Sequence, residues 1–196
     1  PRHSRRKENQ VGQSVSSRLW GAVTVMVGFT LAGCSGLPSS PGNNGIKNPE
    51  FVRATRAPVG ALSSASTLSS LTGSASIDGA VGGRLTVGRF TLVIPRGAFQ
   101  GPATVSITVP DSGVVHCELG IEPPTANSFA VPVILRSDCS GTNALLANRL
   151  TQLWFDEQAL LWREVPGSQP DVVNFDVVAP LQHFSEYGVT EGKAGW

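Results

Sequence analysis

The most constraining feature of this chain is a series of short apolar runs between about residues 77 and 190. Within many runs apolar and polar residues alternate, and Gly, Pro, Asn or Asp separates one run from the next. Alternation with a period of two is typical of half-buried strands, and these separators favour turns. About 110 residues suffice for one core. The pattern predicts an all-β fold, a two-sheet antiparallel β-sandwich.

Nine strands follow from this pattern, and a helical turn is expected only at 144–150. Gly88-Arg89 and Gly167-Ser168 lie where hairpin turns belong. The expected strands are residues 83–87, 90–94, 103–109, 115–121, 131–136, 152–156, 161–165, 172–178 and 183–189.

The N-terminal region has the pattern of an export signal. Residues 1–18 are polar and basic, and residues 19–31 form an uncharged apolar run that is too short to span a bilayer comfortably. The following Leu31-Ala32-Gly33-Cys34 resembles the bacterial lipobox. That resemblance implies that residues 1–33 are a lipoprotein signal peptide, removed after a diacylglycerol is attached to Cys34. The alternative is an ordinary secretory signal that ends near a cysteine.

Lipidation at Cys34 implies a place in the cell. Two or more acyl chains make attachment to a membrane stable, so we expect a lipid-anchored chain with its domain outside the cytoplasm. Ser35 follows the cysteine. The absence of Asp at that position resembles sorting to the outer membrane, if the cell has two membranes.

Residues 34–76 are rich in Ser, Gly, Ala and Thr, notably at 39–45 and 61–76. Such a composition buries too little apolar surface to offset the entropy of ordering the chain. We therefore predict a flexible linker, with a reach of roughly 35 Å for ~40 residues. The alternative is a helix through Leu62, Leu68 and Leu71. The domain is predicted at 77–190 and a C-terminal tail at 191–196.

The charge balance excludes one class of partner. From Ser35 onward there are ten Lys and Arg against thirteen Asp and Glu, a net charge of −3. Nucleic-acid binding requires a clustered basic face. We therefore expect no nucleic acid, and as partners the membrane, through the N-terminal lipid, and an envelope protein or glycan. No metal or cofactor is predicted.

Cys117 and Cys139 are the two cysteines that remain once the anchor takes Cys34. An even pair in an exported domain predicts a disulfide. It would close a loop of about 22 residues and contribute roughly 3 kcal/mol. The alternative is two buried thiols.

Three segments resemble the ZU-five domain, a β-sandwich of zonula-occludens proteins, netrin receptors, ankyrins and many bacterial lipoproteins. The opening is residues 88–98, which read GRFTLVIPRGA, with 104–109 behind it. The middle is residues 121–135, and the end is residues 181–188, which read LQHFSEYG. The usual Gly between the prolines and the Phe of the middle segment is absent. The resemblance covers roughly residues 80–190 and implies a ZU-five-like β-sandwich.

The end segment also contains His183-Phe184-Ser185. In some ZU-five-type domains a His-Phe-Ser sequence cuts its own chain, which implies Ser185 as nucleophile, His183 as base and Phe184–Ser185 as the cleaved bond. Residues 183 and 185 of a strand point to one face, which would make the imidazole and the hydroxyl neighbours. The alternative is that both are ordinary residues of the closing strand.

Aromatic residues cluster in one predicted hairpin, where Trp154 and Trp162 are candidate binding residues. An exposed aromatic side chain there would indicate a surface for protein or sugar, whereas a buried one would belong to the core. The leading expectation is a non-enzymatic interaction or structural module of the cell envelope. The second is a self-cleaving domain.

Overall fold

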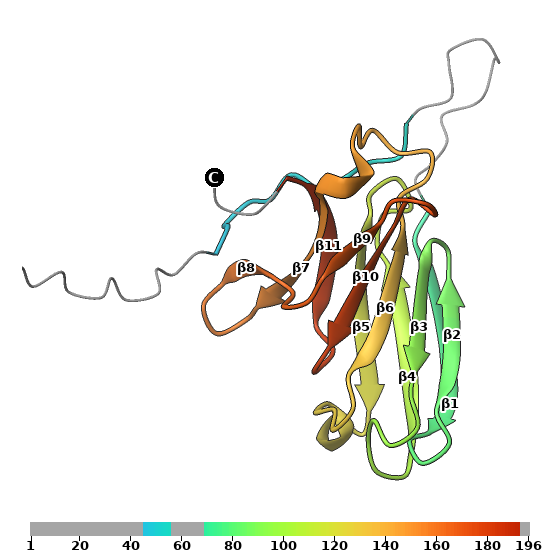
Figure 1. Cartoon of the computed structure of the whole chain (residues 1–196). Helices are drawn as coiled ribbons and strands as arrows, with labels where there is room; N and C mark the ends of the chain where they lie inside the picture. Colours follow the sequence, from blue (N-terminus) through green and yellow to red (C-terminus); the bar gives the residue numbers. More distant parts are fainter. Residues whose placement is uncertain (1–44, 56–68, 193–196) are drawn as a thin grey trace, which may run out of the picture. The chain divides into compact units, whose positions relative to one another are not determined.

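Two antiparallel β-sheets form the fold, in a computed structural model that describes residues 45–55 and 69–192 (Figure 1). Eleven strands lie within these residues. The β-sandwich predicted from the sequence is confirmed. None of the helices in the described residues is long and apolar enough to cross a membrane.

The larger sheet has six strands in the order β1-β4-β5-β11-β7-β8. Its neighbouring strands are antiparallel throughout. In sheet order the strands are β1 Leu71–Asp78, β4 Pro102–Val109, β5 His116–Glu122, β11 Glu186–Glu191, β7 Leu150–Asp156 and β8 Leu161–Glu164.

The smaller sheet has five strands in the order β2-β3-β6-β10-β9. Two short 3-10 helices join the strands: η1 at Pro124–Ala126, and η2 at Ala147–Arg149 within the expected helical turn. In sheet order the strands are β2 Gly83–Val87, β3 Phe90–Ile94, β6 Val133–Asp138, β10 Asp176–Leu181 and β9 Gln169–Asp171.

The core lies between the inner faces of the two sheets. In β3, Phe90, Leu92 and Ile94 are buried, and the residues between them are half-buried, as a period of two requires. One polar link crosses this core, where the Ser137 hydroxyl of β6 donates to Gln152 Oε1 of β7 at 2.8 Å. Apolar alternation therefore builds the interior, with a single buried side-chain hydrogen bond joining the sheets at that point.

Strand β1 lies partly in the region predicted as linker. The sequence placed the domain boundary at residue 77, but β1 begins at Leu71 and pairs along its full length with β4. Its residues 72–76 are Thr, Gly, Ser, Ala and Ser, of which none is buried. Small polar residues suit an edge strand that is held by backbone hydrogen bonds rather than by apolar burial. Composition alone therefore set the boundary too late.

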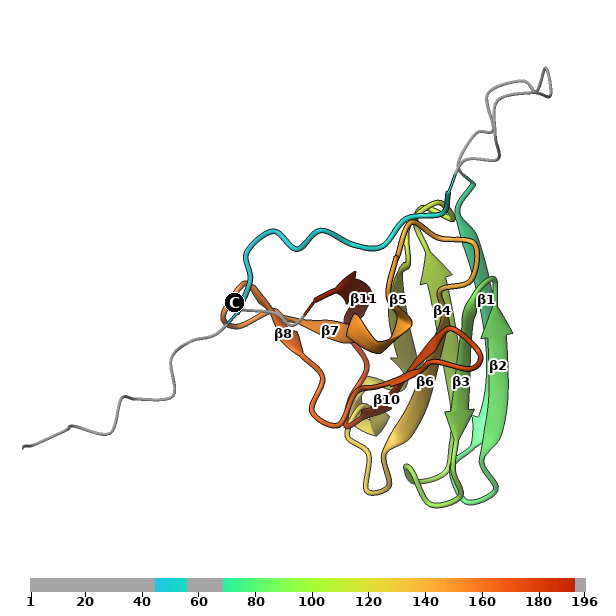
Figure 2. The same ribbon diagram turned by 45° about the horizontal axis from the view of Figure 1, so that its top comes forward.

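A second part of the predicted linker also belongs to the sandwich. Residues 45–55, here called the strap, run from β8 toward the opposite side of the six-stranded sheet (Figure 2). The Ile46 and Trp162 backbones exchange two hydrogen bonds of 2.8 Å. Val52, only 4% exposed, donates to Val189 O and accepts from Val115 N. The linker prediction is wrong for these residues because isolated bridges and one buried side chain hold them.

The C-terminal strands are shifted from their expected positions. The sequence predicted strands at 172–178 and 183–189, whereas β10 is Asp176–Leu181 and β11 is Glu186–Glu191. Val172 and Val173, read as strand residues, are exposed in the turn between β9 and β10. The apolar character of these two valines led to the prediction of a strand at a place where the chain reverses direction.

Candidate functional site

The segment His183-Phe184-Ser185 lies between β10 and β11, not inside a strand. The Ser185 hydroxyl donates to Phe155 O at 2.8 Å, and His183 Nδ1 lies 3.3 Å from Phe184 O. The prediction that a strand would align the imidazole and the hydroxyl on one face is therefore wrong. The chain bends here, and each of the two groups has a different partner.

Asn127 holds the backbone of Phe184 from both sides. Its Oδ1 accepts from Phe184 N at 2.5 Å, and its Nδ2 donates to Phe184 O at 3.0 Å. The Phe184 ring, 4% exposed, meets Phe129 edge-on with ring centres 4.7 Å apart. The Asn127 amide thus forms the two backbone hydrogen bonds that a neighbouring strand would form, although Phe184 lies outside any strand. Sequence patterns gave no sign of this pair, because its members are 57 residues apart.

The two cysteines of the domain are free and buried thiols, which corrects the predicted disulfide. Cys117 lies on β5 of the larger sheet, and Cys139 follows β6 of the smaller one. Burial raises the pKa of both thiols, that of Cys139 to about 12. Both thiols are packed in the core as small apolar side chains, and free cysteine is among the most buried residue types.

The two tryptophans proposed as binding residues differ in position. Trp162 is buried, with ring centres 4.8 Å from Phe51 of the strap and 5.3 Å from Phe155, so it belongs to the core. Trp154 is half-buried, and its ring lies 4.9 Å edge-on from His183. Trp154 and His183 line a hollow of about 190 Å³ together with Tyr187, and Trp162 does not reach it. Only Trp154 therefore remains a candidate binding residue.

Four large apolar side chains are exposed on two loops at one end of the sandwich. Leu145 and Leu146 precede η2, and Val172 and Val173 follow β9; their exposed fractions are 84%, 49%, 56% and 88%. The hydrogen bond from Cys139 N to Phe175 O, at 2.9 Å, joins the start of the first loop to the end of the second. Figure 1 shows both loops at the upper end of the strands. We call these four residues the apolar loop surface.

The first loop is held by a carboxylate. Leu145 N and Leu146 N donate to Glu191 Oε2 and Oε1, each at 2.9 Å. Charged acceptors form stronger hydrogen bonds than neutral ones. The two leucine side chains are therefore exposed, while the Glu191 carboxylate fixes their backbone.

The second loop is held by Asp171. Its Oδ1 accepts from Val173 N and Asn174 N, and its Oδ2 accepts from the Asn174 side chain at 2.7 Å. The Asn174 side chain and then its backbone lower the pKa of Asp171, so the carboxylate stays charged at neutral pH. Phe175 has a φ of 59°, a conformation that persists in non-glycine residues only where the surroundings enforce it. This loop, too, is preorganised.

Cys34 and the signal segment lie outside the described residues. Comparisons with protein-family models, curated proteins and solved structures found no match. The proposals for function therefore depend on the sequence motifs and on the geometry described above.

Proposed function

We propose that the chain is a lipid-anchored lipoprotein whose ZU-five-like β-sandwich is a non-enzymatic interaction or structural module of the cell envelope. The lipobox at Cys34 supports the anchor and the location outside the cytoplasm, in the outer membrane where the cell has two. The apolar loop surface carries the interaction role. Its partner is an envelope protein or glycan.

Four large apolar side chains are exposed on two loops at the same end of the sandwich (Figure 1). Groups of exposed apolar side chains on soluble domains mark contact sites. Glu191 and Asp171 fix the backbone beneath these side chains, so little conformational entropy remains to be lost on binding. The surface thus combines apolar area with preorganisation, the two properties that favour association.

The strap changes the expected distance from the membrane. The sandwich begins to hold the chain at Ile46, only twelve residues after Cys34. Even fully extended, these twelve residues span at most about 42 Å, against about 140 Å for a fully extended linker of ~40 residues, at ~3.5 Å per residue. The module is therefore held closer to the bilayer than a linker of ~40 residues would allow.

Photo-crosslinking in cells tests the interaction role. A photoreactive amino acid is placed at Leu145 or at Val173 in the full chain. The control is Val81, 74% exposed in the turn between β1 and β2. We expect both loop positions to give the same crosslinked product, which is absent with Val81. Equal products from Val81, or no product from either loop, would contradict the proposal.

Self-cleavage is the second candidate, and one observation favours it. The Phe184 carbonyl oxygen already accepts from Asn127 Nδ2, a donor placed where negative charge would develop. The Ser185 oxygen would bond to the Phe184 carbonyl carbon as the C–N bond breaks, with the hydroxyl proton passing to the released amine. Water would then hydrolyse the ester. In the folded chain the Ser185 hydroxyl donates instead to Phe155 O.

The mass of the denatured chain distinguishes the two candidates. Self-cleavage predicts fragments that end at Phe184 and begin at Ser185, and a Ser185→Ala variant that stays whole. An uncleaved wild-type chain removes this candidate and leaves the interaction role in place.

A further inference from the structure

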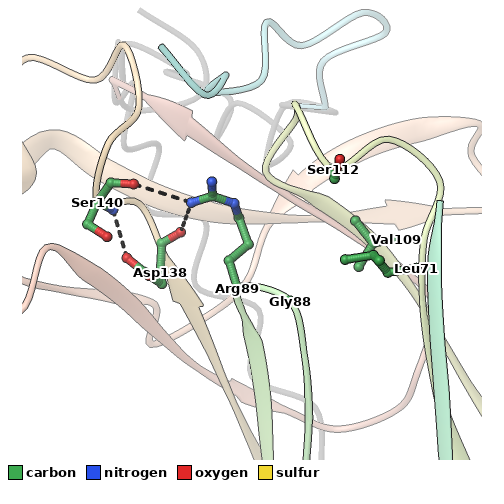
Figure 3. A pocket seen from close by; sticks show the side chains of 7 residues that line it. All are labelled: Leu71, Gly88, Arg89, Val109, Ser112, Asp138 and Ser140. Atoms are coloured by element: carbon green, nitrogen blue, oxygen red, sulfur yellow. Dashed lines mark hydrogen bonds between the residues drawn. The ribbon is translucent and has the colours of Figure 1, made fainter. Parts of the chain in front are cut away.

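A second hollow, of about 380 Å³, opens beside the turn between β2 and β3 (Figure 3). It lies where the two sheet edges β1 and β2 approach each other. Its lining is mixed: one wall is polar and the other is apolar. The lining residues are Leu71, Gly88, Arg89, Val109, Ser112, Asp138 and Ser140.

Arg89 is fixed in this hollow by carbonyl groups. Its Nη1 donates to Asp138 O at 2.7 Å and to Ser140 O at 3.4 Å, while Asp138 N donates to Arg89 O at 2.8 Å. Figure 3 shows both side-chain bonds leaving from one nitrogen of the guanidinium. Among the described residues, Nε and Nη2 have no acceptor. The group is thus held in place through Nη1, and the three N–H donors on Nε and Nη2 are unused.

The charge of Arg89 has no carboxylate partner within the described part of the chain. Arg136, by contrast, pairs with Asp171 and Asp176. The Asp138 carboxylate accepts from Ser140 N at 2.7 Å and forms no ion pair with Arg89. A half-buried guanidinium without a counter-ion gains from any carboxylate that enters.

The opposite wall of the hollow indicates which chemical group lies next to the carboxylate of a ligand. Leu71, which is 37% exposed, supplies an apolar surface, and Ser112 brings a hydroxyl to the same hollow (Figure 3). The edge formed by Nε and Nη2 of an arginine matches the two oxygens of a carboxylate. Asp138 also lines the hollow, and its negative charge disfavours ligands with the higher charge of phosphate.

We propose that this hollow binds the carboxylate of a ligand whose adjoining group is apolar, as in the C-terminal residue of a peptide. Arg89 holds the carboxylate through Nε and Nη2. Leu71 contacts the apolar side chain. This site is separate from the apolar loop surface and does not require its partner.

Fluorescence polarisation tests the site with the full chain in detergent. The probe is a fluorescein-labelled Gly-Ala-Leu peptide with a free C-terminal carboxylate, compared with the same peptide as an amide. We expect the acid to bind about tenfold more tightly, a difference of ~1.4 kcal/mol. Equal affinities, or no binding of the acid, would overturn the proposal.

Variants locate the effect. Arg89→Gln should remove the preference for the acid, while Arg84→Gln, an exposed arginine of β2, should keep it. Because Arg89 also holds two carbonyls, Leu71→Glu provides a second test: it places a negative charge on the opposite wall and should weaken acid binding. A preference that persists in Arg89→Gln, or an unchanged affinity for the acid in Leu71→Glu, would contradict the assignment.

Competition defines the ligand class. Unlabelled N-acetyl-leucine should displace the peptide acid at lower concentration than inorganic phosphate does. If phosphate displaces it equally well, the hollow is a general anion site and the proposal is wrong.

Discussion

The Ser137 hydroxyl and the Gln152 side chain form a hydrogen bond of 2.8 Å between the two sheets, and both residues are fully buried. Gln152 Nε2 has no partner among the described residues. The bond is thus the one satisfied contact of a costly buried amide. It also fixes the position of β6 relative to β7.

Ser137→Ala should destabilise the fold by about 1–3 kcal/mol, because it leaves the whole Gln152 amide buried without partners. The double variant Ser137→Ala, Gln152→Met should recover most of this loss, since both polar groups are then gone. Urea unfolding measures the free energies, with Ser74→Ala on exposed β1 as the control. A double variant no more stable than Ser137→Ala would contradict this account.

Glu191→Ala should loosen the first loop without unfolding the sandwich. Its carboxylate is the acceptor for Leu145 N and Leu146 N, so hydrogen exchange at these amides should accelerate by about tenfold or more. Glu157→Ala, in the exposed turn after β7, is the matched control. Unchanged exchange at both leucines would show that Glu191 does not hold the loop.

Asn127→Ala should cost about 1–3 kcal/mol, because Phe184 N and Phe184 O each lose a partner in a half-buried site. Asn127→Asp should be less stable at neutral than at acidic pH. A charged carboxylate repels Phe184 O, whereas a protonated one can donate to it. Thermal unfolding at the two pH values measures the difference, and an Asp variant equally stable at both would contradict the contact.

Cys117 and Cys139 should both be alkylated after denaturation without a reducing agent, and should react slowly in the folded protein. Burial raises the folded-state pKa of each thiol, so little reactive thiolate is present at neutral pH. For the same reason the thiols favour the folded state below the unfolded pKa of about 8.5, and this contribution declines as the pH rises above it. Failure to alkylate either cysteine after denaturation would instead indicate a disulfide.

Much of the sandwich could be predicted from local patterns. β2 and β3 match their predicted bounds, since apolar alternation and the Gly88-Arg89 turn mark both strands. β1 could not be predicted, because its small polar residues resemble a linker and its pairing with β4 is set by the fold. The strap was missed because its isolated bridges to distant parts of the chain are likewise set by the fold.

The site residues were harder to predict than the strands. Asn127, Glu191 and Arg89 act on backbone groups that lie 45 or more residues away in sequence. Backbone acceptors and donors have no residue signature, so no spacing pattern reveals such pairs. His183 and Ser185 had a signature, but the bend after β10 gives them separate partners.

The most direct test of the proposed lipoprotein is the intact mass of the mature chain extracted from bacterial membranes. The proposal predicts one uncleaved chain that begins at Cys34 and carries the mass of a diacylglycerol, and a Cys34→Ser variant that is absent from the membrane fraction. A mature chain that begins elsewhere without lipid, or one cut between Phe184 and Ser185, would contradict it.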